Sequence, residues 1–264
     1  MKRLSAISAL LALSLALAAC QGATNQNTQP VTSSASASTP SYSSGTSAAT
    51  LSAVAAGFSA YDRGDFAGAA KHFRSAAEQA HTQAQAILGA MYMAGTGVQQ
   101  DYTEARKWFL PAARNGSLAA QSGLGHIYEY GKGVPQDFSE AARWYRLAAE
   151  QDHATAQTRL GNFYASGMGV TQDYAEALRW LRAAAEQDHA DAQLYLGALY
   201  GDGEGVTRDP VEALMWMTLA AEQGREFAIK LRARTAEKLS AAEVAEAERR
   251  AEDWRRAYRA RRQS

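Results

Sequence analysis

Cysteine is almost absent from this sequence of 264 residues, in which Cys20 is the only one. A single thiol cannot form a disulfide within the chain, and it cannot supply the set of thiolates that a cysteine-based metal site needs. No nucleophile motif and no phosphate-binding loop are recognisable. The sequence therefore excludes a disulfide-stapled fold and offers no support for catalysis.

The sequence also lacks an N-terminal hydrophobic run long enough to cross a membrane. The apolar run from Leu4 to Leu17 has 14 residues, whereas a membrane-spanning helix needs about 20. It follows the basic start Met1-Lys2-Arg3. We therefore predict that residues 1–19 are a secretory signal peptide.

The end of this run, Leu17-Ala18-Ala19-Cys20, resembles a bacterial lipobox. The resemblance implies cleavage before Cys20 and lipidation of its thiol and of the new amino group. The alternative is an ordinary signal peptide with a chance cysteine, since a small-residue cleavage site is common to both. Gln21, in place of Asp, resembles the signal for sorting to the outer membrane.

Charge is missing from Gln21 to Thr50, where Ser, Thr, Ala, Gln, Asn and Pro dominate. A segment of this composition cannot bury a core, so we predict that residues 20–50 are a lipidated cysteine and a disordered tether. About thirty disordered residues have a root-mean-square span of about 30 Å. Such a tether lets the folded part stand off a bilayer.

The rest of the chain is dominated by a pattern that recurs every 36 residues. Three columns recur without a slip in register: Trp108, Trp144, Trp180 and Trp216; Gly89, Gly125, Gly161 and Gly197; and Tyr92, Tyr128, Tyr164 and Tyr200. A fixed period of this length is typical of a solenoid of stacked helical units.

Each copy predicts a pair of helices. The first helix has apolar residues at helical spacing and ends in a Gly-x-Gly turn such as Gly167/Gly169, because glycine adopts left-handed backbone angles without a Cβ penalty. The second begins with Asp-x-x-Glu, which predicts a capping box with Asp as N-cap and Glu reaching back. The pairs are Asp101/Glu104, Asp137/Glu140, Asp173/Glu176 and Asp209/Glu212.

The motif A-x-A-Q-x-x-L-G-x-x-Y-x-x-G-x-G-V-x-x-D-x-x-E-A-x-x-W-x-x-x-A-A resembles the Sel-one-like repeat, a longer-looped relative of the tetratricopeptide repeat, from about Leu51 to Phe227. The resemblance implies an all-α, right-handed superhelical solenoid of antiparallel helix hairpins that serves as an adaptor, without chemistry or a cofactor. We assign residues 51–236 to it. The first copy departs from the motif, because a short turn around Gly64 replaces the glycine loop and His72 stands in the Trp column. We expect an N-terminal cap there.

Residues 237–264 are predicted to form a basic C-terminal capping helix. Residues 225–264 contain 12 basic and 7 acidic residues, whereas residues 20–224 contain 13 basic and 20 acidic residues. The pattern Ser240-Ala-Ala-Glu243 predicts a capping box, and an apolar stripe follows at Val244, Ala247, Ala251, Trp254 and Tyr258. Seven arginines lie mostly off this stripe: Arg249, Arg250, Arg255, Arg256, Arg259, Arg261 and Arg262. They form a solvated cap face, a patch for anionic lipid or a nucleic-acid site, and export disfavours the last.

The histidines and tryptophans favour structural roles. His81, His153 and His189 share one column, but successive helix layers lie about 8–10 Å apart, too far to share a metal held at about 2 Å. We interpret them as turn residues, and we predict no metal site. Trp180 shares its face with Ala177 and Ala184, so we expect core packing rather than a stacking platform for a ligand. Mid-helix Gly161 indicates a close approach of two backbones.

Recognition is then expected at first-helix positions that change from copy to copy. These positions lie at i, i+3, i+7 and i+10, on one helical face, which the family resemblance places on the concave side. Tyr130 and Asp202 lie at the edge of this face. The candidate partner-binding residues are Ala119, Ser122, His126, Glu129, Tyr130, Thr155, Thr158, Asn162, Asp191, Leu194 and Asp202. Ordinary solvent positions that are free to vary are the alternative.

We predict a non-enzymatic protein-binding adaptor of the bacterial cell envelope. It is expected to be a monomer without a cofactor, anchored by lipid on the periplasmic side, most simply at the outer membrane, with a protein or peptide partner and no nucleic acid. The acidic array favours a basic partner segment. The alternatives are an envelope hydrolase acting on cell-wall or β-lactam substrates, an activity claimed for cysteine-rich relatives, and a structural protein that contacts anionic lipid.

Overall fold

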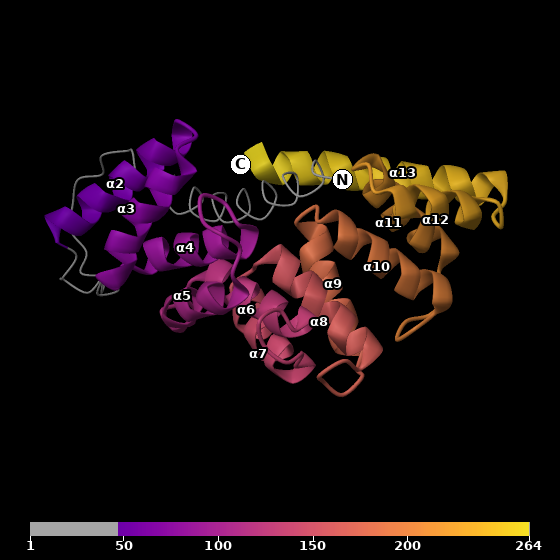
Figure 1. The fold of residues 1–264 in the computed structure, drawn as a ribbon. Coiled ribbons are helices and arrows are strands. Elements are labelled where there is room, and N and C mark those ends of the chain that lie inside the picture. Colours follow the sequence, from indigo (N-terminus) through magenta and orange to yellow (C-terminus); the bar gives the residue numbers. More distant parts are fainter. Residues whose placement is uncertain (1–46, 264) are drawn as a thin grey trace, which may run out of the picture. The chain divides into compact units, whose positions relative to one another are not determined.

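The computed structural model describes residues 47–263, which form twelve α-helices and contain no strand. The expected signal peptide, Cys20 and most of the expected tether lie outside the described residues. Figure 1 shows a succession of helices joined by short connections. They are α2 (Ala48–Asp62), α3 (Phe66–Glu78), α4 (Thr82–Ala94), α5 (Tyr102–Arg114), α6 (Leu118–Tyr130), α7 (Phe138–Ala149), α8 (Ala154–Ser166), α9 (Tyr174–Glu186), α10 (Ala190–Asp202), α11 (Pro210–Glu222), α12 (Glu226–Ala236) and α13 (Ala241–Gln263).

The described part of the chain forms two compact units, one with α2 to α6 that ends at residue 136 and one with α7 to α13 that begins at residue 137. Within each unit, consecutive helices pack against one another, α4 on α5 in the first and α8 on α9 in the second. The predicted all-α architecture of helix hairpins is confirmed. The first hairpin, α2 and α3, is joined by the expected short turn at Gly64, whose φ is 79°.

The aspartate predicted to begin each second helix does so. Asp101 Oδ1 accepts hydrogen bonds from the backbone N–H groups of Thr103 and Glu104, at 2.8 and 3.0 Å. Asp137, Asp173 and Asp209 make the same two bonds in their copies. These bonds satisfy N–H groups that have no partner inside the helix, so the N-cap prediction is confirmed.

The glutamate of the predicted capping box has a different role. Glu176 does not bond back to the cap; its carboxylate accepts a hydrogen bond from Trp180 Nε1 at 3.0 Å and pairs with Arg179 at 3.0 Å. Glu104 and Glu212 accept the same bond from the Trp of their copies. The full capping-box prediction is therefore wrong for these helices, because the indole and the arginine, one turn further on, compete for the carboxylate.

Both glycines of the Gly-x-Gly turn are required. The first caps the first helix in the left-handed region, with φ of 71° at Gly167. The second approaches the preceding second helix so closely that a Cβ on Gly169 would lie 2.2 Å from the carbonyl oxygen of Phe138. The turn thus links one copy to the copy before it.

The core uses the Trp and Gly columns as predicted. Trp144, Trp180 and Trp216 are buried, and Trp108 is half-buried. A Cβ on Gly161 would lie 2.7 Å from Leu181 Cγ and 3.2 Å from the carbonyl oxygen of Ala177. The close approach of α8 and α9 predicted from this mid-helix glycine is confirmed.

Buried glutamines connect the copies, a feature that the sequence reasoning missed. Gln157 Nε2 donates to the carbonyl of Ala149, and its Oε1 accepts from Gln187 Nε2 at 2.8 Å. Gln193 and Gln223 repeat the side-chain bond at 3.0 Å one copy later. Since buried Gln157 and Gln193 each bond a backbone carbonyl of the preceding hairpin and a second glutamine, these bonds fix how one copy stacks on the next.

The C-terminal helix α13 begins with the predicted capping box and packs mainly on α11. Glu243 Oε2 accepts from the Ser240 backbone N–H at 2.8 Å, and Ser240 Oγ accepts from the Glu243 N–H at 3.3 Å. Ala247 and Ala251 are fully buried, and the Trp254 ring lies 5.9 Å from that of Trp216. The predicted apolar stripe therefore covers the last full hairpin.

Candidate functional site

In the first unit, the candidate residues lie on α6. Ala119, Ser122 and His126 are half-buried, and Tyr130 is 44% exposed. The His126 and Tyr130 rings are 4.7 Å apart. Glu129 is only 8% exposed, so the expectation that it presents its carboxylate on an open face is wrong. The cause is its position four residues after buried Gly125, which places it on the packed side of α6.

In the second unit, the candidates lie on α8 and α10. Thr155, Asn162 and Asp191 are half-buried, and Asp202 is exposed. Thr158 and Leu194 are buried, which corrects their placement on an open face. Thr158 Oγ1 donates to the carbonyl of Ala154 at 2.8 Å, and Leu194 packs against residues of α11 and α12, namely Ala220, Ala228 and Leu231. Both contribute to stacking rather than to a free surface.

The histidine column lies at the starts of the first helices, in the turns where it was predicted. Nδ1 of His81 and of His153 each accepts an N-cap hydrogen bond at 3.2 Å. Burial, reinforced by His189, lowers the pKa of His153. Burial also lowers the pKa of His189, whose ring contacts Thr158 Oγ1 at 3.0 Å instead of capping α10. Among residues 47–263, no three His, Cys, Asp or Glu side chains gather as metal ligands would.

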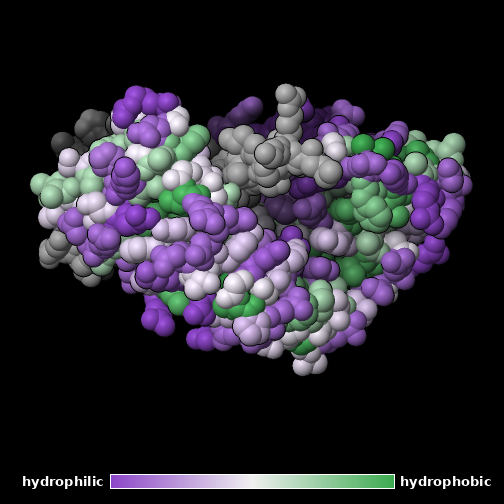
Figure 2. All heavy atoms as spheres, in the orientation of Figure 1, coloured by the Kyte–Doolittle hydropathy of each residue, from purple (hydrophilic) through white to green (hydrophobic). Residues whose placement is uncertain are grey.

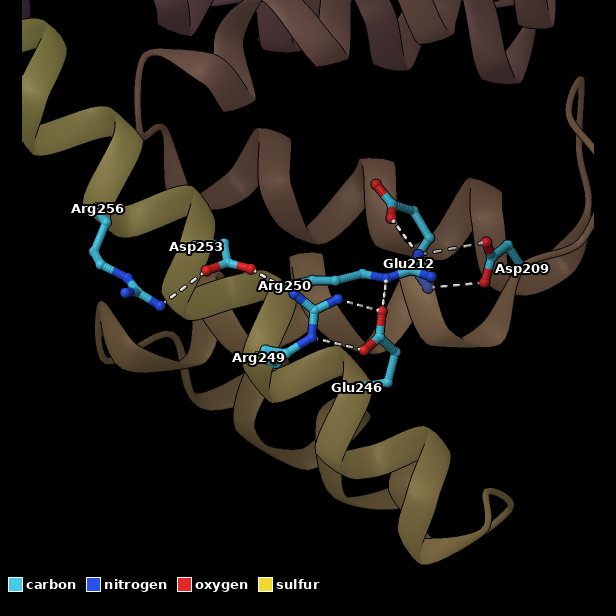
Figure 3. Close-up of polar contacts among 7 residues, drawn as sticks. All are labelled: Asp209, Glu212, Glu246, Arg249, Arg250, Asp253 and Arg256. Atoms are coloured by element: carbon cyan, nitrogen blue, oxygen red, sulfur yellow. Dashed lines mark hydrogen bonds and ion pairs between the residues drawn. The ribbon is translucent and has the colours of Figure 1, made fainter.

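In the middle of α13, Arg249, Arg250, Arg255 and Arg256 are engaged in ion pairs. Arg250 binds Glu246 on its own helix at 2.8 Å and Glu212 on α11 at 3.2 Å, as Figure 3 shows. Hydrogen bonds from Arg249 and Arg250 lower the pKa of Glu246 to about 2. Arg255 pairs with Glu222 at 3.0 Å, and Arg256 pairs with Asp253 at 2.9 Å. The middle of α13 is therefore a cap face whose charges are compensated.

The first-helix columns continue onto α12, which the sequence reasoning missed. Thirty-six residues after Asp191, Leu194 and Ala198 stand Phe227, Lys230 and Arg234. The period itself could have found them, but α12 lacks the Gly, Tyr and Trp signature that marked the earlier copies. Phe227 is 66% exposed, so this row presents an aromatic side chain to solvent.

The acidic surplus of the array does not lie on the first helices. Among α4, α6, α8 and α10, the only acidic residues are Glu129, Asp191 and Asp202. The other carboxylates include the four aspartate N-caps and the glutamates that bind Trp and Arg, which belong to the second helices. The net charge of the array therefore does not describe the candidate face. Of the helices in the described part of the chain, none is long and apolar enough to cross a membrane.

The chain is similar to known repeat proteins. The Sel1 repeat model matches five consecutive copies, at residues 56–81, 82–117, 118–153, 154–189 and 190–224. The crystal structure of a Sel1 repeat protein from Oxalobacter formigenes has 35% identity and a TM-score of 0.62, covering 69% of this chain and 74% of that one. A protective antigen of uropathogenic Escherichia coli, displaying an SLR fold, has 30% identity and a TM-score of 0.63 over 80% of this chain, which spans 54% of that protein. No curated protein matches the chain.

Proposed function

Because the chain belongs to the Sel1 repeat family, whose members are protein-interaction scaffolds, we propose that it is a non-enzymatic adaptor of the bacterial envelope. It holds a protein segment on the face formed by its first helices. It is tethered to the membrane by a lipidated Cys20, on the periplasmic side of the outer membrane.

The observation that supports this role is the contrast between the columns of the repeat. The columns that recur serve packing. Trp180 is buried, and Leu181 fills the space beside Gly161 that a Cβ would need. The first-helix columns differ in chemistry from copy to copy while remaining at least partly accessible at Ser122, Tyr130 and Asn162. A scaffold with a constant core and a varied face suits recognition of an extended partner.

Partner capture tests the adaptor role. The chain would be cross-linked in envelope extracts and its partners identified by mass spectrometry. The face variant carries two changes, Tyr130→Ala and Asn162→Arg. Leu147→Ala is the matched control, because Leu147 is a large exposed side chain, 38% accessible, on the second helix α7. We expect Tyr130→Ala, combined with Asn162→Arg, to lower recovery of a stoichiometric partner while Leu147→Ala leaves it unchanged.

Two outcomes would contradict this role. Capture that survives the face variants but is lost on removal of residues 255–264 would make the basic end of α13 the working surface. Turnover of a cell-wall fragment by the purified chain would make it an enzyme.

The anchor has a separate test. The lipobox-like Leu17-Ala18-Ala19-Cys20 supports lipidation, so Cys20→Ser should abolish labelling by an alkyne fatty-acid probe and release the chain from the membrane fraction. Gln21→Ser, one residue later, serves as the control and should still be labelled. Equal labelling of Cys20→Ser would overturn the lipid anchor without touching the adaptor role.

A further inference from the structure

Two imidazole rings lie at the starts of neighbouring first helices in the second unit, His153 before α8 and His189 before α10. His153 Nδ1 accepts the N-cap hydrogen bond from the Ala156 N–H at 3.2 Å. His189 does not cap α10 but turns onto α8, where its Nδ1 lies 3.0 Å from Thr158 Oγ1 and its Nε2 lies 3.4 Å from Thr155 Oγ1. One ring therefore caps α8, and the other joins α10 to it.

The hydrogen bonds decide which nitrogen of each neutral ring carries the proton. A ring nitrogen that accepts a hydrogen bond has no proton, so neutral His153 carries its proton on Nε2. Thr158 Oγ1 donates its own proton to the carbonyl of Ala154 at 2.8 Å. It therefore accepts from His189, which carries its proton on Nδ1. Each ring thus has one nitrogen at which a further proton can bind.

A further proton acts differently at the two rings. On His153 it would occupy Nδ1 and remove the acceptor that satisfies the Ala156 N–H, so the start of α8 would lose its cap. On His189 it would occupy Nε2, which faces Thr155 Oγ1, and a hydroxyl can accept a hydrogen bond there. The hydrogen bonds of His189 therefore survive protonation, and only the added charge is unfavourable.

The surroundings of both rings oppose a positive charge. Hydrophilic residues are spread over much of the molecular face that Figure 2 shows, but burial lowers the pKa of both rings, and the charge of His189 lowers that of His153 further. Asp191 of α10 raises the pKa of His189, whereas Arg225 and Arg159 lower it. Asp191 is already bound by Arg225 through Nε at 3.1 Å and Nη2 at 3.2 Å. Because repulsion between two cations is mutual, the pair takes up its first proton more easily than its second.

We propose that His153 and His189 form a proton-sensitive joint between two copies of the repeat: a proton taken up by the pair removes the cap of α8 and loosens its contact with α10. The joint is a property of the array itself and does not depend on the adaptor function. Thr155 and Asp191 of the candidate face flank it, so its opening changes the surface that a partner meets.

The direction of the pH dependence follows from the burial of the rings. In the closed joint the pKa of each ring lies below its ordinary value, which an exposed ring regains once the joint opens. The closed state is therefore fully favoured above about pH 6.5 and loses its advantage as the pH falls below that value. This is the range in which histidine acts as a switch in proteins.

Among the copies in the described part of the chain, this junction alone has a histidine at this column on both sides. The column consists of His81, Ser117, His153, His189 and Arg225. His81 Nδ1 accepts the cap bond of α4 at 3.2 Å, but its counterpart in the next copy is Ser117, which adds no positive charge. Ser117 in turn caps α6 with a hydroxyl that does not titrate. The chain thus contains its own controls for the joint.

Amide hydrogen exchange of the full chain at about pH 7.5 and about pH 5 tests the joint. Rates are converted to protection factors, so that the intrinsic pH dependence of exchange cancels. We expect protection in the first turn of α8, above all at Ala156, to fall on the order of tenfold at the lower pH, because the helix start opens locally. A smaller fall is expected in the first turn of α10, whose ring rests on α8. Protection in the first turn of α6 should change less than about twofold.

Three variants separate the two rings. His153→Asn keeps a cap acceptor that does not titrate, so protection in α8 should change less than about twofold between the two pH values. His81→Asn makes the same change at the same column and should leave the fall in α8 as it is in the unmodified chain. His189→Ser introduces the residue found at Ser117 and removes the charge that lowers the pKa of His153. An NMR titration of the His153 ring should then move its midpoint to higher pH.

Four results would overturn the joint. An equal fall in α6 and α8 would make the loss of protection global. A fall in α8 that persists in His153→Asn would assign the pH dependence to another group. An unchanged midpoint for His153 in His189→Ser would show that the rings act independently. A fall in α8 that leaves α10 unchanged would reduce the joint to a single cap.

Discussion

The phenyl ring of Phe109 is held between two glycines, and this arrangement predicts the outcome of adding one methyl group. A Cβ on Gly89 of α4 would lie 2.6 Å from Phe109 Cδ1, and a Cβ on Gly123 of α6 would lie 2.7 Å from Phe109 Cε2. The ring is 1% exposed. In Gly89→Ala the ring cannot move away, because Gly123 already touches its other side.

The expected loss of stability follows from two opposing effects. Replacing a mid-helix glycine by alanine stabilises a helix by about 1 kcal/mol. Overpacking a buried site costs about 1–3 kcal/mol, and the upper end applies because the ring is blocked on both sides. We therefore expect Gly89→Ala to lower the free energy of unfolding by about 2 kcal/mol.

The assay is urea unfolding followed by helical circular dichroism, with a control in the same chain. Gly201 of α10 is also helical, but a Cβ there would lie 3.6 Å from Ala213 Cβ, which is ordinary contact. Gly201→Ala should thus stabilise the chain by up to about 1 kcal/mol. Both glycines are helical, and their packing separates the two expected outcomes.

A second substitution tests the cause. Phe109→Leu removes part of the ring, so its cost should be smaller in the Gly89→Ala background than alone, with a coupling of about 1–2 kcal/mol between the two sites. If Gly89→Ala were as stable as Gly201→Ala, or if the two changes at residues 89 and 109 were additive, the packing argument would be refuted.

Three further predictions concern single sites. Trp180→Ala should cost about 3–5 kcal/mol because the indole is buried; a nearly unchanged melting temperature would favour a ligand platform. Asn115→Gln should stabilise the chain by about 1 kcal/mol in urea unfolding. Gln85 Oε1 is buried without a hydrogen-bond partner, and in later copies a glutamine at the position of Asn115 donates to the buried glutamine. No gain in stability would contradict that reasoning. Since the pKa of His153 is lowered in the folded state, the unfolded chain binds the proton first, and stability should fall as pH drops below about 6.5. His153→Asn, which keeps an N-cap acceptor, should reduce this loss in melts at pH 7 and pH 5, and an identical loss would assign the pH dependence elsewhere.

Features that depend on neighbours within a few residues were predictable from the sequence. The N-cap role of Asp101 and its counterparts, the glycine turns and the Ser240/Glu243 capping box arise within one helical turn, so spacing alone indicates them. The 36-residue period predicted the hairpins and the burial of Trp180, because a column that recurs in register meets the same environment in every copy.

Contacts between residues far apart in the sequence required the tertiary structure. Glu176 could have completed a capping box, and its bond to Trp180 depends on where the indole is held by the neighbouring helices. Thr158 and Leu194 share a variable column with half-buried Ser122, yet the following helices bury them. Variation between copies therefore does not by itself mean exposure.

The sequence by itself determined the repeat, its register, the helix starts and ends, and the separation of the acidic array from the basic end. Only the tertiary structure decided which carboxylates bind which cations, and hence that α13 is compensated by Glu212 and Glu222 while Phe227 and Arg234 face solvent. The physical reason is range. Backbone geometry and capping are decided within one turn of helix, whereas burial and ion pairing depend on which side chains are brought together by segments some 15 to 40 residues apart.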